Sequence, residues 1–164
     1  MNKKFIPKIA AAALAVIIAV VAIFVILNLG DPIVSLGSNA ALPGDTVEIP
    51  LEIDKNHGVL AAQIYIEYDT DNIKFDSYSN GEVFDMCWAN EENGKLAIIV
   101  VMNDDEESSK DGLVATLKFK AKISADEGDY KLKFDKETMF IDYNPDPNAD
   151  RLDIKYKSGN ITVK

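Results

Sequence analysis

The stretch HGVLAAQIYIEYD, residues 57–69, alternates so regularly that it predicts a β-strand. Successive side chains of a strand point to opposite faces, so the stretch has two rows. The apolar row is expected to pack on the core and consists of Leu60, Ala62, Ile64, Ile66 and Tyr68. The other row is mixed in character and consists of Ala61, Gln63, Tyr65 and Glu67. Alternation alone does not say whether this second row meets water or a partner.

Beyond residue 30 the chain shows short runs of β type, separated by turn residues, and no helical periodicity. The predicted strands cover residues 33–36, 46–53, 60–68, 73–78, 83–89, 95–102, 113–123, 130–134 and 160–163. The pair Asn93-Gly94 is the strongest turn signal, because a type I′ hairpin needs two residues with positive φ. Nine runs of this kind predict an all-β fold, an antiparallel sandwich or jelly roll.

The predicted strand KLAIIVVM, residues 95–102, is unusual because Leu96 to Met102 includes no polar residue on either face. Antiparallel strands usually have one polar face. A strand with apolar residues on both faces would promote aggregation if it were exposed at the edge of a sheet. We therefore expect this strand to lie centrally in its sheet. Its outer face would be covered either by another segment of the chain or by another protein.

Residues 1–30 differ in kind from the rest, with three lysines, no acidic residue and an unbroken apolar run over residues 9–27. Nineteen residues span about 28 Å as a helix, close to the hydrocarbon thickness of a bilayer. The lysines predict a cytoplasmic N-terminus and an exported domain, residues 31–164. A cleaved signal peptide is the alternative, although bulky residues occupy the place of a small-residue cleavage site.

Charge and composition exclude several function classes. Residues 31–164 hold 14 basic and 27 acidic residues, a net charge of −13, so nucleic acid is not expected as a partner. One histidine, His57, cannot build a multi-histidine metal site, and one cysteine, Cys87, cannot form an internal disulfide. Nothing in the sequence places two carboxylates across a cleft, so we do not expect an enzyme.

Six segments in this order and spacing resemble cohesin domains, the dockerin-binding modules of bacterial cell-surface scaffolds. They are PGDTVEIPLEI (43–53), GVLAAQIYIEYDTDNIKF (58–75), GKLAIIVVMND (94–104), KDGLVATLKFKAK (110–122), GDYKLKF (128–134) and SGNITV (158–163). The resemblance implies a nine-stranded antiparallel sandwich with jelly-roll topology and no catalytic activity. It also implies a flat face, including the third and sixth strands, that receives a calcium-loaded dockerin. Calcium is thus expected on the partner, and no cofactor on this chain.

Carried onto this sequence, the resemblance places the third-strand contacts at Ala61, Gln63, Tyr65 and Glu67. It places the sixth-strand contacts at Ile98, Val100, Met102 and Asn103, and it leaves Ala97, Ile99 and Val101 for the core. Many cohesins have Asn and Asp where this chain has Ala61 and Gln63. The resemblance therefore implies the binding face but not the class of dockerin.

Two further sites have competing interpretations. Residues 142–153 place oxygen ligands at the spacing of a calcium loop, namely Asp142, Asn144, Asp146, Asp150 and Asp153. Pro147 stands where such loops have glycine, and no helices flank the segment, so a solvated turn is the alternative. Trp88 and Tyr65 could stack on sugars, which keeps a carbohydrate-binding module as an alternative function. A third possible function is that of a structural β-sandwich on the cell surface that binds no ligand.

The resulting hypothesis is a membrane-tethered cohesin-like module at the extracellular face of the plasma membrane. It would anchor a dockerin-bearing protein, either a polysaccharide-degrading enzyme or a scaffold subunit, and would reach carbohydrate only through that partner. If the N-terminal segment is cleaved, the same module would be secreted.

Overall fold

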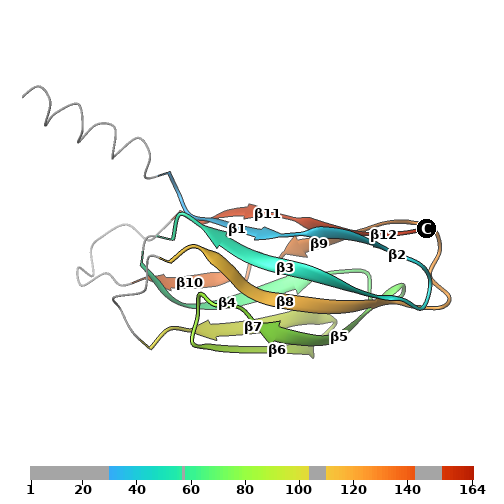
Figure 1. Cartoon of the computed structure of the whole chain (residues 1–164), viewed down its shortest axis with the longest axis horizontal. Helices are drawn as coiled ribbons and strands as arrows, with labels where there is room; N and C mark the ends of the chain where they lie inside the picture. Colours follow the sequence, from blue (N-terminus) through green and yellow to red (C-terminus); the bar gives the residue numbers. More distant parts are fainter. Residues whose placement is uncertain (1–29, 57, 104–109, 143–152) are drawn as a thin grey trace, which may run out of the picture. The chain divides into compact units, whose positions relative to one another are not determined.

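The computed structural model describes residues 30–56, 58–103, 110–142 and 153–164, and its regular secondary structure in these ranges is entirely β-strand (Figure 1). The prediction of an all-β fold is therefore confirmed. Residues 31–164 form one compact unit. Within the described ranges no helix is long and apolar enough to cross a membrane. The predicted span, residues 9–27, lies outside them.

The strands form two sheets. The first has five strands in the order β11 (Lys155–Lys157), β1 (Ile33–Leu36), β3 (Thr46–Asp54), β8 (Gly112–Ala121) and β5 (Ile73–Asn80). The second has seven, with the order β2 (Ser38–Ala41), β12 (Gly159–Val163), β9 (Gly128–Phe134), β4 (Val59–Glu67), β7 (Lys95–Val101) and β6 (Met86–Glu92). The seventh, β10 (Met139–Asp142), pairs with β4 outside this order.

The described residues thus contain twelve strands, and the expected count of nine is too low. The three strands that were not predicted, β2, β10 and β11, are only three or four residues long. The sandwich is also not wholly antiparallel, because β1 pairs with β11 and β2 pairs with β12 in parallel. The remaining pairs are antiparallel. The Asn93-Gly94 turn has the expected geometry, with φ of 52° and 76°.

The N-terminal and the C-terminal segments of the domain each pass from one sheet to the other. Gly37 separates β1 from β2, and Ser158 separates β11 from β12, so each pair of short strands is one segment shared between the sheets. The two segments touch where they cross. A Cβ atom on Gly159 would lie 2.1 Å from the carbonyl oxygen of Gly37, so only glycine allows this approach.

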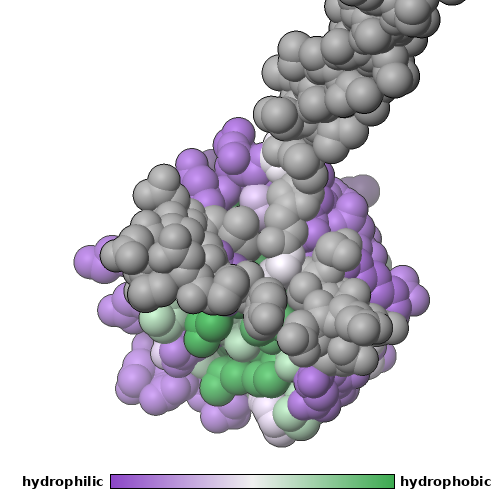
Figure 2. All heavy atoms as spheres, turned by 90° about the vertical axis from the view of Figure 1, so that its left-hand side faces the viewer, coloured by the Kyte–Doolittle hydropathy of each residue, from purple (hydrophilic) through white to green (hydrophobic). Residues whose placement is uncertain are grey.

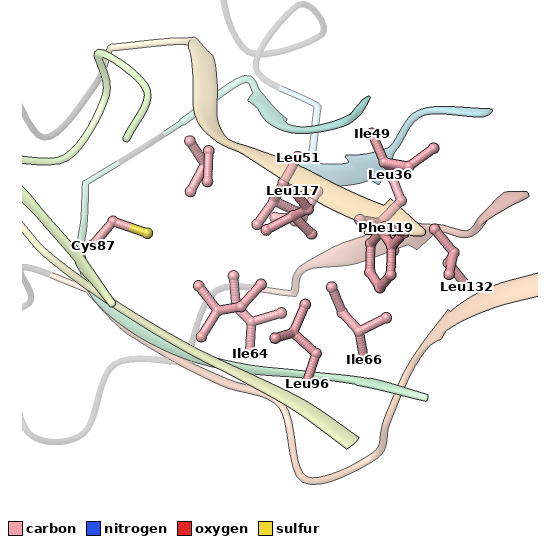
Figure 3. Close-up of a cluster of buried hydrophobic side chains, with 14 of the residues drawn as sticks. Leu36, Ile49, Leu51, Ile64, Ile66, Cys87, Leu96, Leu117, Phe119 and Leu132 are labelled. Carbon is pink, nitrogen blue, oxygen red and sulfur yellow. The ribbon is translucent and has the colours of Figure 1, made fainter. Parts of the chain in front are cut away.

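The core lies between the two sheets (Figure 3). Leu51, Leu117 and Phe119 of the first sheet face Ile64 and Leu96 of the second, and all five are at most 1% exposed. The Phe119 ring makes edge-on contacts with Tyr68 and Phe75, at centroid distances of 5.3 and 5.7 Å. Each such side chain contributes roughly 1.5–3 kcal/mol when fully buried. A core of this kind holds the outer faces of the sheets in a fixed position.

Candidate protein-binding face

The mixed row of β4 faces outward, as the alternation predicts. Ala61, Gln63 and Tyr65 are partly exposed and Glu67 is exposed, whereas Ala62, Ile64 and Ile66 between them are buried. The Gln63 amide nitrogen donates a hydrogen bond to the Tyr65 hydroxyl oxygen at 2.5 Å. These two polar side chains are therefore already oriented relative to each other on the surface of the strand.

The expectation of which β7 side chains face outward and which face the core is wrong. Ile98 and Val100 are completely buried and Met102 is 7% exposed, so these three side chains belong to the core. The row that faces outward is Lys95, Ala97, Ile99 and Val101. The reason is the register with β4, in which Gln63 pairs with Ile99 and Tyr65 with Ala97. Directly paired residues share one face of a sheet.

Asn103, the fourth residue expected on this strand's contact surface, lies just beyond the end of β7 and is exposed. Its backbone N–H donates a hydrogen bond to an Asp85 carboxylate oxygen at 2.5 Å. Asn103 therefore borders the outward row of β7 without being part of its ladder.

Large apolar side chains from β10, β7 and β6 lie beside Ala61 and Gln63 of β4 on the outer face of this sheet, in two rows that run across the strands. The first row is Met139 (β10), Gln63 (β4), Ile99 (β7) and Trp88 (β6). The second row is Ile141 (β10), Ala61 (β4), Val101 (β7) and Met86 (β6). We call these eight residues the apolar outer face.

The apolar outer face is well exposed despite its composition. Met139 is 48% exposed, Ile141 57%, Ile99 44% and Trp88 52%, which makes them four of the seven large apolar side chains exposed in the described ranges. Figure 2, which looks at the end of the domain where β7 finishes, shows hydrophobic side chains grouped together beside hydrophilic ones. A group of exposed apolar side chains on one flat sheet is typical of a protein-binding surface.

The sequence pattern indicated only part of this face. It does not indicate Met139 and Ile141, because their strand is short, and the family resemblance places Ile99 and Val101 in the core. It suggests Trp88 for stacking on sugars and does not show that Trp88 is a neighbour of Ile99. One available signal was Lys95: it begins the outward row of β7 and is the only polar residue on that strand.

An ionic cluster borders the apolar outer face where β7 begins and β4 ends. The Lys95 ammonium contacts carboxylate oxygens of Asp135 at 2.5 Å, Glu67 at 3.7 Å and Glu137 at 3.9 Å. The hydrogen bond from Lys95, with a second from the Glu137 backbone N–H, lowers the pKa of Asp135 to about 2. The same contact with Asp135 raises the pKa of Lys95.

Asp135 also organises the turn between β9 and β10. Its backbone N–H donates to the Tyr65 carbonyl oxygen at 2.8 Å, and the Tyr65 N–H donates to the Thr138 hydroxyl oxygen at 3.0 Å. The turn is thereby held against β4, at the point where β10 begins. The ionic cluster thus helps to place Met139 and Ile141 beside Gln63 and Ala61.

The other sequence-derived sites do not form a reactive or metal centre in the described ranges. Burial raises the pKa of the Cys87 thiol to about 11, which makes this cysteine a core residue and not a nucleophile. No group of three or more metal-ligating His, Cys, Asp or Glu side chains occurs among the described residues. Of the predicted calcium loop, Asp142 ends β10 and Asp153 precedes β11, while Asn144, Asp146 and Asp150 lie outside the described ranges.

A two-layer β-sandwich whose second sheet exposes a group of apolar side chains is compatible with a protein-binding module. Comparison with known families agrees: the chain matches the cohesin domain family over residues 32–163, and it belongs to that family. Cohesin domains are non-catalytic modules. No curated protein matches the chain.

Solved structures with the same fold come from both bacteria and archaea. A cohesin of Clostridium acetobutylicum has a TM-score of 0.71 at 24% identity, over 82% of this chain and 91% of that one. The sixth cohesin of scaffoldin B from Acetivibrio cellulolyticus, solved in complex with a mutated dockerin, has 0.68 at 21% identity, over 82% and 100%. A non-cellulosomal cohesin of the archaeon Archaeoglobus fulgidus has 0.67 at 14% identity, over 82% and 92%.

Proposed function

We propose that this cohesin domain binds a calcium-loaded dockerin through the apolar outer face. The observation that carries the proposal is the alignment of Met139, Ile99 and Trp88 in one exposed row across β10, β7 and β6. Solved relatives with this fold, including the Acetivibrio cellulolyticus cohesin, are complexes with dockerins. A flat apolar face fits a partner that presents helices, because helices can lie across several strands at once.

The chemistry of the face restricts the partner. Burying each of the four large apolar side chains removes nonpolar area from water, which contributes roughly 25 cal/mol per Å² before the costs of association. The Ala61 side chain offers no hydrogen bond, and the Gln63 amide nitrogen already donates to Tyr65, so the Gln63 carbonyl oxygen is the one side-chain acceptor at these two positions. The preferred dockerin therefore presents mainly apolar side chains to the centre of β4, with at most one hydrogen-bond donor toward Gln63. This follows from the absence of the Asn and Asp that many cohesins have at these two positions.

We further propose that the module holds its partner at the extracellular face of the plasma membrane, with residues 9–27 as the anchor and the N-terminus in the cytoplasm. The support is the 19-residue apolar run and its flanking lysines. The captured protein would be a polysaccharide-degrading enzyme or a scaffold subunit, which would link the cell to carbohydrate through the partner. If the anchor is removed, the module would be secreted with the same binding face.

A binding measurement tests the use of the apolar outer face. The full chain in detergent micelles would be titrated by calorimetry with a panel of calcium-loaded dockerins from cellulosome-forming bacteria. We expect at least one to bind, with loss of binding when a chelator removes calcium. Ile99→Asp should weaken that complex by about 2 kcal/mol or more, because a buried unpaired carboxylate would replace an apolar contact.

The matched control is Ile123→Asp, since Ile123 is 84% exposed and lies in the turn after β8, a strand of the first sheet. It makes the same chemical change and should leave the dockerin complex unaltered. Equal weakening by both variants, or binding that survives Ile99→Asp, would rule out the apolar outer face as the site. Binding to insoluble polysaccharide that is lost in Trp88→Ala, without any dockerin complex, would favour the carbohydrate-binding alternative.

A further inference from the structure

Three lysines gather at one place on the outer surface of the first sheet. Lys74 on β5 pairs directly with Lys120 on β8, and Lys122 follows at the end of β8. With Ile123 and Ser124 they line an open depression of about 470 Å³. Like charges on directly paired residues destabilise a sheet. Such an arrangement in a domain of net charge −13 requires an explanation.

In the described part of the chain the three lysines form no close ion pair, although Lys122 lies near Asp69, whose pKa is lowered chiefly by the Asn72 side-chain hydrogen bond and in smaller part by the Lys122 charge. None of the five ion pairs among the described residues involves Lys74, Lys120 or Lys122. Lys118, two residues earlier on β8, does form one, with Glu48 at 3.0 Å. The lysine depression is therefore a local region of positive charge on an acidic domain.

The backbone around the depression is fixed by hydrogen bonds. The Lys122 N–H donates to the Asn72 carbonyl oxygen at 2.8 Å, and the Ala125 N–H donates to the Lys122 carbonyl oxygen at 3.0 Å. Ala125 is buried, which holds the turn of residues 122–125 against the domain. Ile123 is left 84% exposed on the border of the depression, next to the Ser124 hydroxyl.

We propose that the lysine depression binds an acidic sugar unit of a polysaccharide. The ammonium groups of Lys74, Lys120 and Lys122 would hold its carboxylate or phosphate, and Ile123 would contact the apolar C–H face of the ring. The volume lies within the range of about 300–1,000 Å³ that is common for small-ligand sites. A continuous polyanion fits less well, because the rest of the acidic domain would repel it.

The location separates this site from the apolar outer face. The depression belongs to the first sheet, at the end of the domain where β8 finishes, whereas β1 starts at the opposite end (Figure 1). A partner on β4, β7 and β6 would therefore leave the depression free. The module would then contact an acidic polysaccharide directly, in addition to any carbohydrate reached through its partner.

The test uses the full chain in zwitterionic detergent, titrated with a neutral oligosaccharide that carries a single galacturonate unit and with the same oligosaccharide in which that unit is the neutral methyl ester. We expect the acidic form to bind and the ester not to bind. The double variant Lys74→Gln, Lys120→Gln should weaken binding of the acidic form by about tenfold, since two charge contacts are lost. Raising the salt concentration should weaken it as well, because exposed charges are screened.

The matched control is Lys131→Gln, Lys157→Gln, which removes two exposed lysines elsewhere and should change affinity by less than about twofold. Equal binding of acid and ester, or equal weakening by both double variants, would overturn the proposal. Binding only to phosphatidylglycerol vesicles would overturn it in favour of a lipid surface. Ile99→Asp should leave the sugar titration unchanged, so this site can fail or succeed independently of dockerin binding.

Discussion

At the scale of single residues, Asp135 is the most informative side chain. Only 5% of its side chain is exposed, yet it is held as a carboxylate by Lys95 and by the N–H of Glu137. Its pKa is lowered from 3.8 to about 2 because the charged form receives both hydrogen bonds. A group whose pKa is lower in the folded state stabilises the fold above its unfolded pKa. That stabilisation is lost as the pH falls toward the folded pKa.

The lowered pKa of Asp135 predicts that its contribution to the stability of the fold is lost in acid. Asp135→Asn should lower the melting temperature at neutral pH, and the difference from the unmodified chain should shrink between about pH 4 and pH 2. Thermal melts across this range measure the effect, with Asp126→Asn, at an exposed position, as the control. A difference that stayed constant down to pH 2 would mean that Asp135 stabilises the turn without its charge.

At the scale of elements, β7 shows how one strand supplies both the core and the apolar outer face. Val100 is completely buried in the core and Val101 is partly exposed on the outer face, although the two valines are adjacent. Val100→Asp should destabilise the fold by roughly 3 kcal/mol or more, because it buries an unpaired carboxylate. Val101→Asp should cost about 1 kcal/mol or less.

Urea denaturation of the two variants distinguishes these outcomes. The same pair separates folding from binding: Val101→Asp should fold and yet bind a dockerin more weakly. If Val101→Asp were the more destabilising of the two, the observed register of β4 and β7 would be contradicted.

The same strand explains how far the sequence could predict the structure. The alternation of residues predicts which row of β4 side chains points outward, because this row contains the polar residues Gln63 and Glu67. It failed on β7 because Leu96 to Val101 is apolar on both rows, so the strand's facing depends on pairing with β4. The three missed strands are short, and all three residues of β11 are exposed, so hydrophobic periodicity carries little signal for them. The apolar outer face could not be predicted completely, since β10 and β6 reach it only through tertiary pairing.

At the scale of the whole molecule, the proposed anchor and the acidic domain should divide between compartments. We expect the full chain to sediment with membranes of the producing cell and to remain there after an alkaline carbonate wash. Protease added to intact spheroplasts should digest the domain, because the positive-inside rule places it outside. A soluble product in the medium, shortened near residue 30, would instead show cleavage.

The position of β1 has a mechanical consequence for an anchored module. If the membrane holds residues 1–30 and a partner is pulled away, tension enters the domain at Asp31, which forms an ion pair with Lys155 at 2.8 Å. The next segment, β1, is hydrogen-bonded along both edges, to β3 and to β11, and continues as β2 in the other sheet. Force along β1 therefore loads many hydrogen bonds together, in shear, and does not peel them apart in sequence. An anchored module of this construction would therefore resist being unravelled from its tethered end.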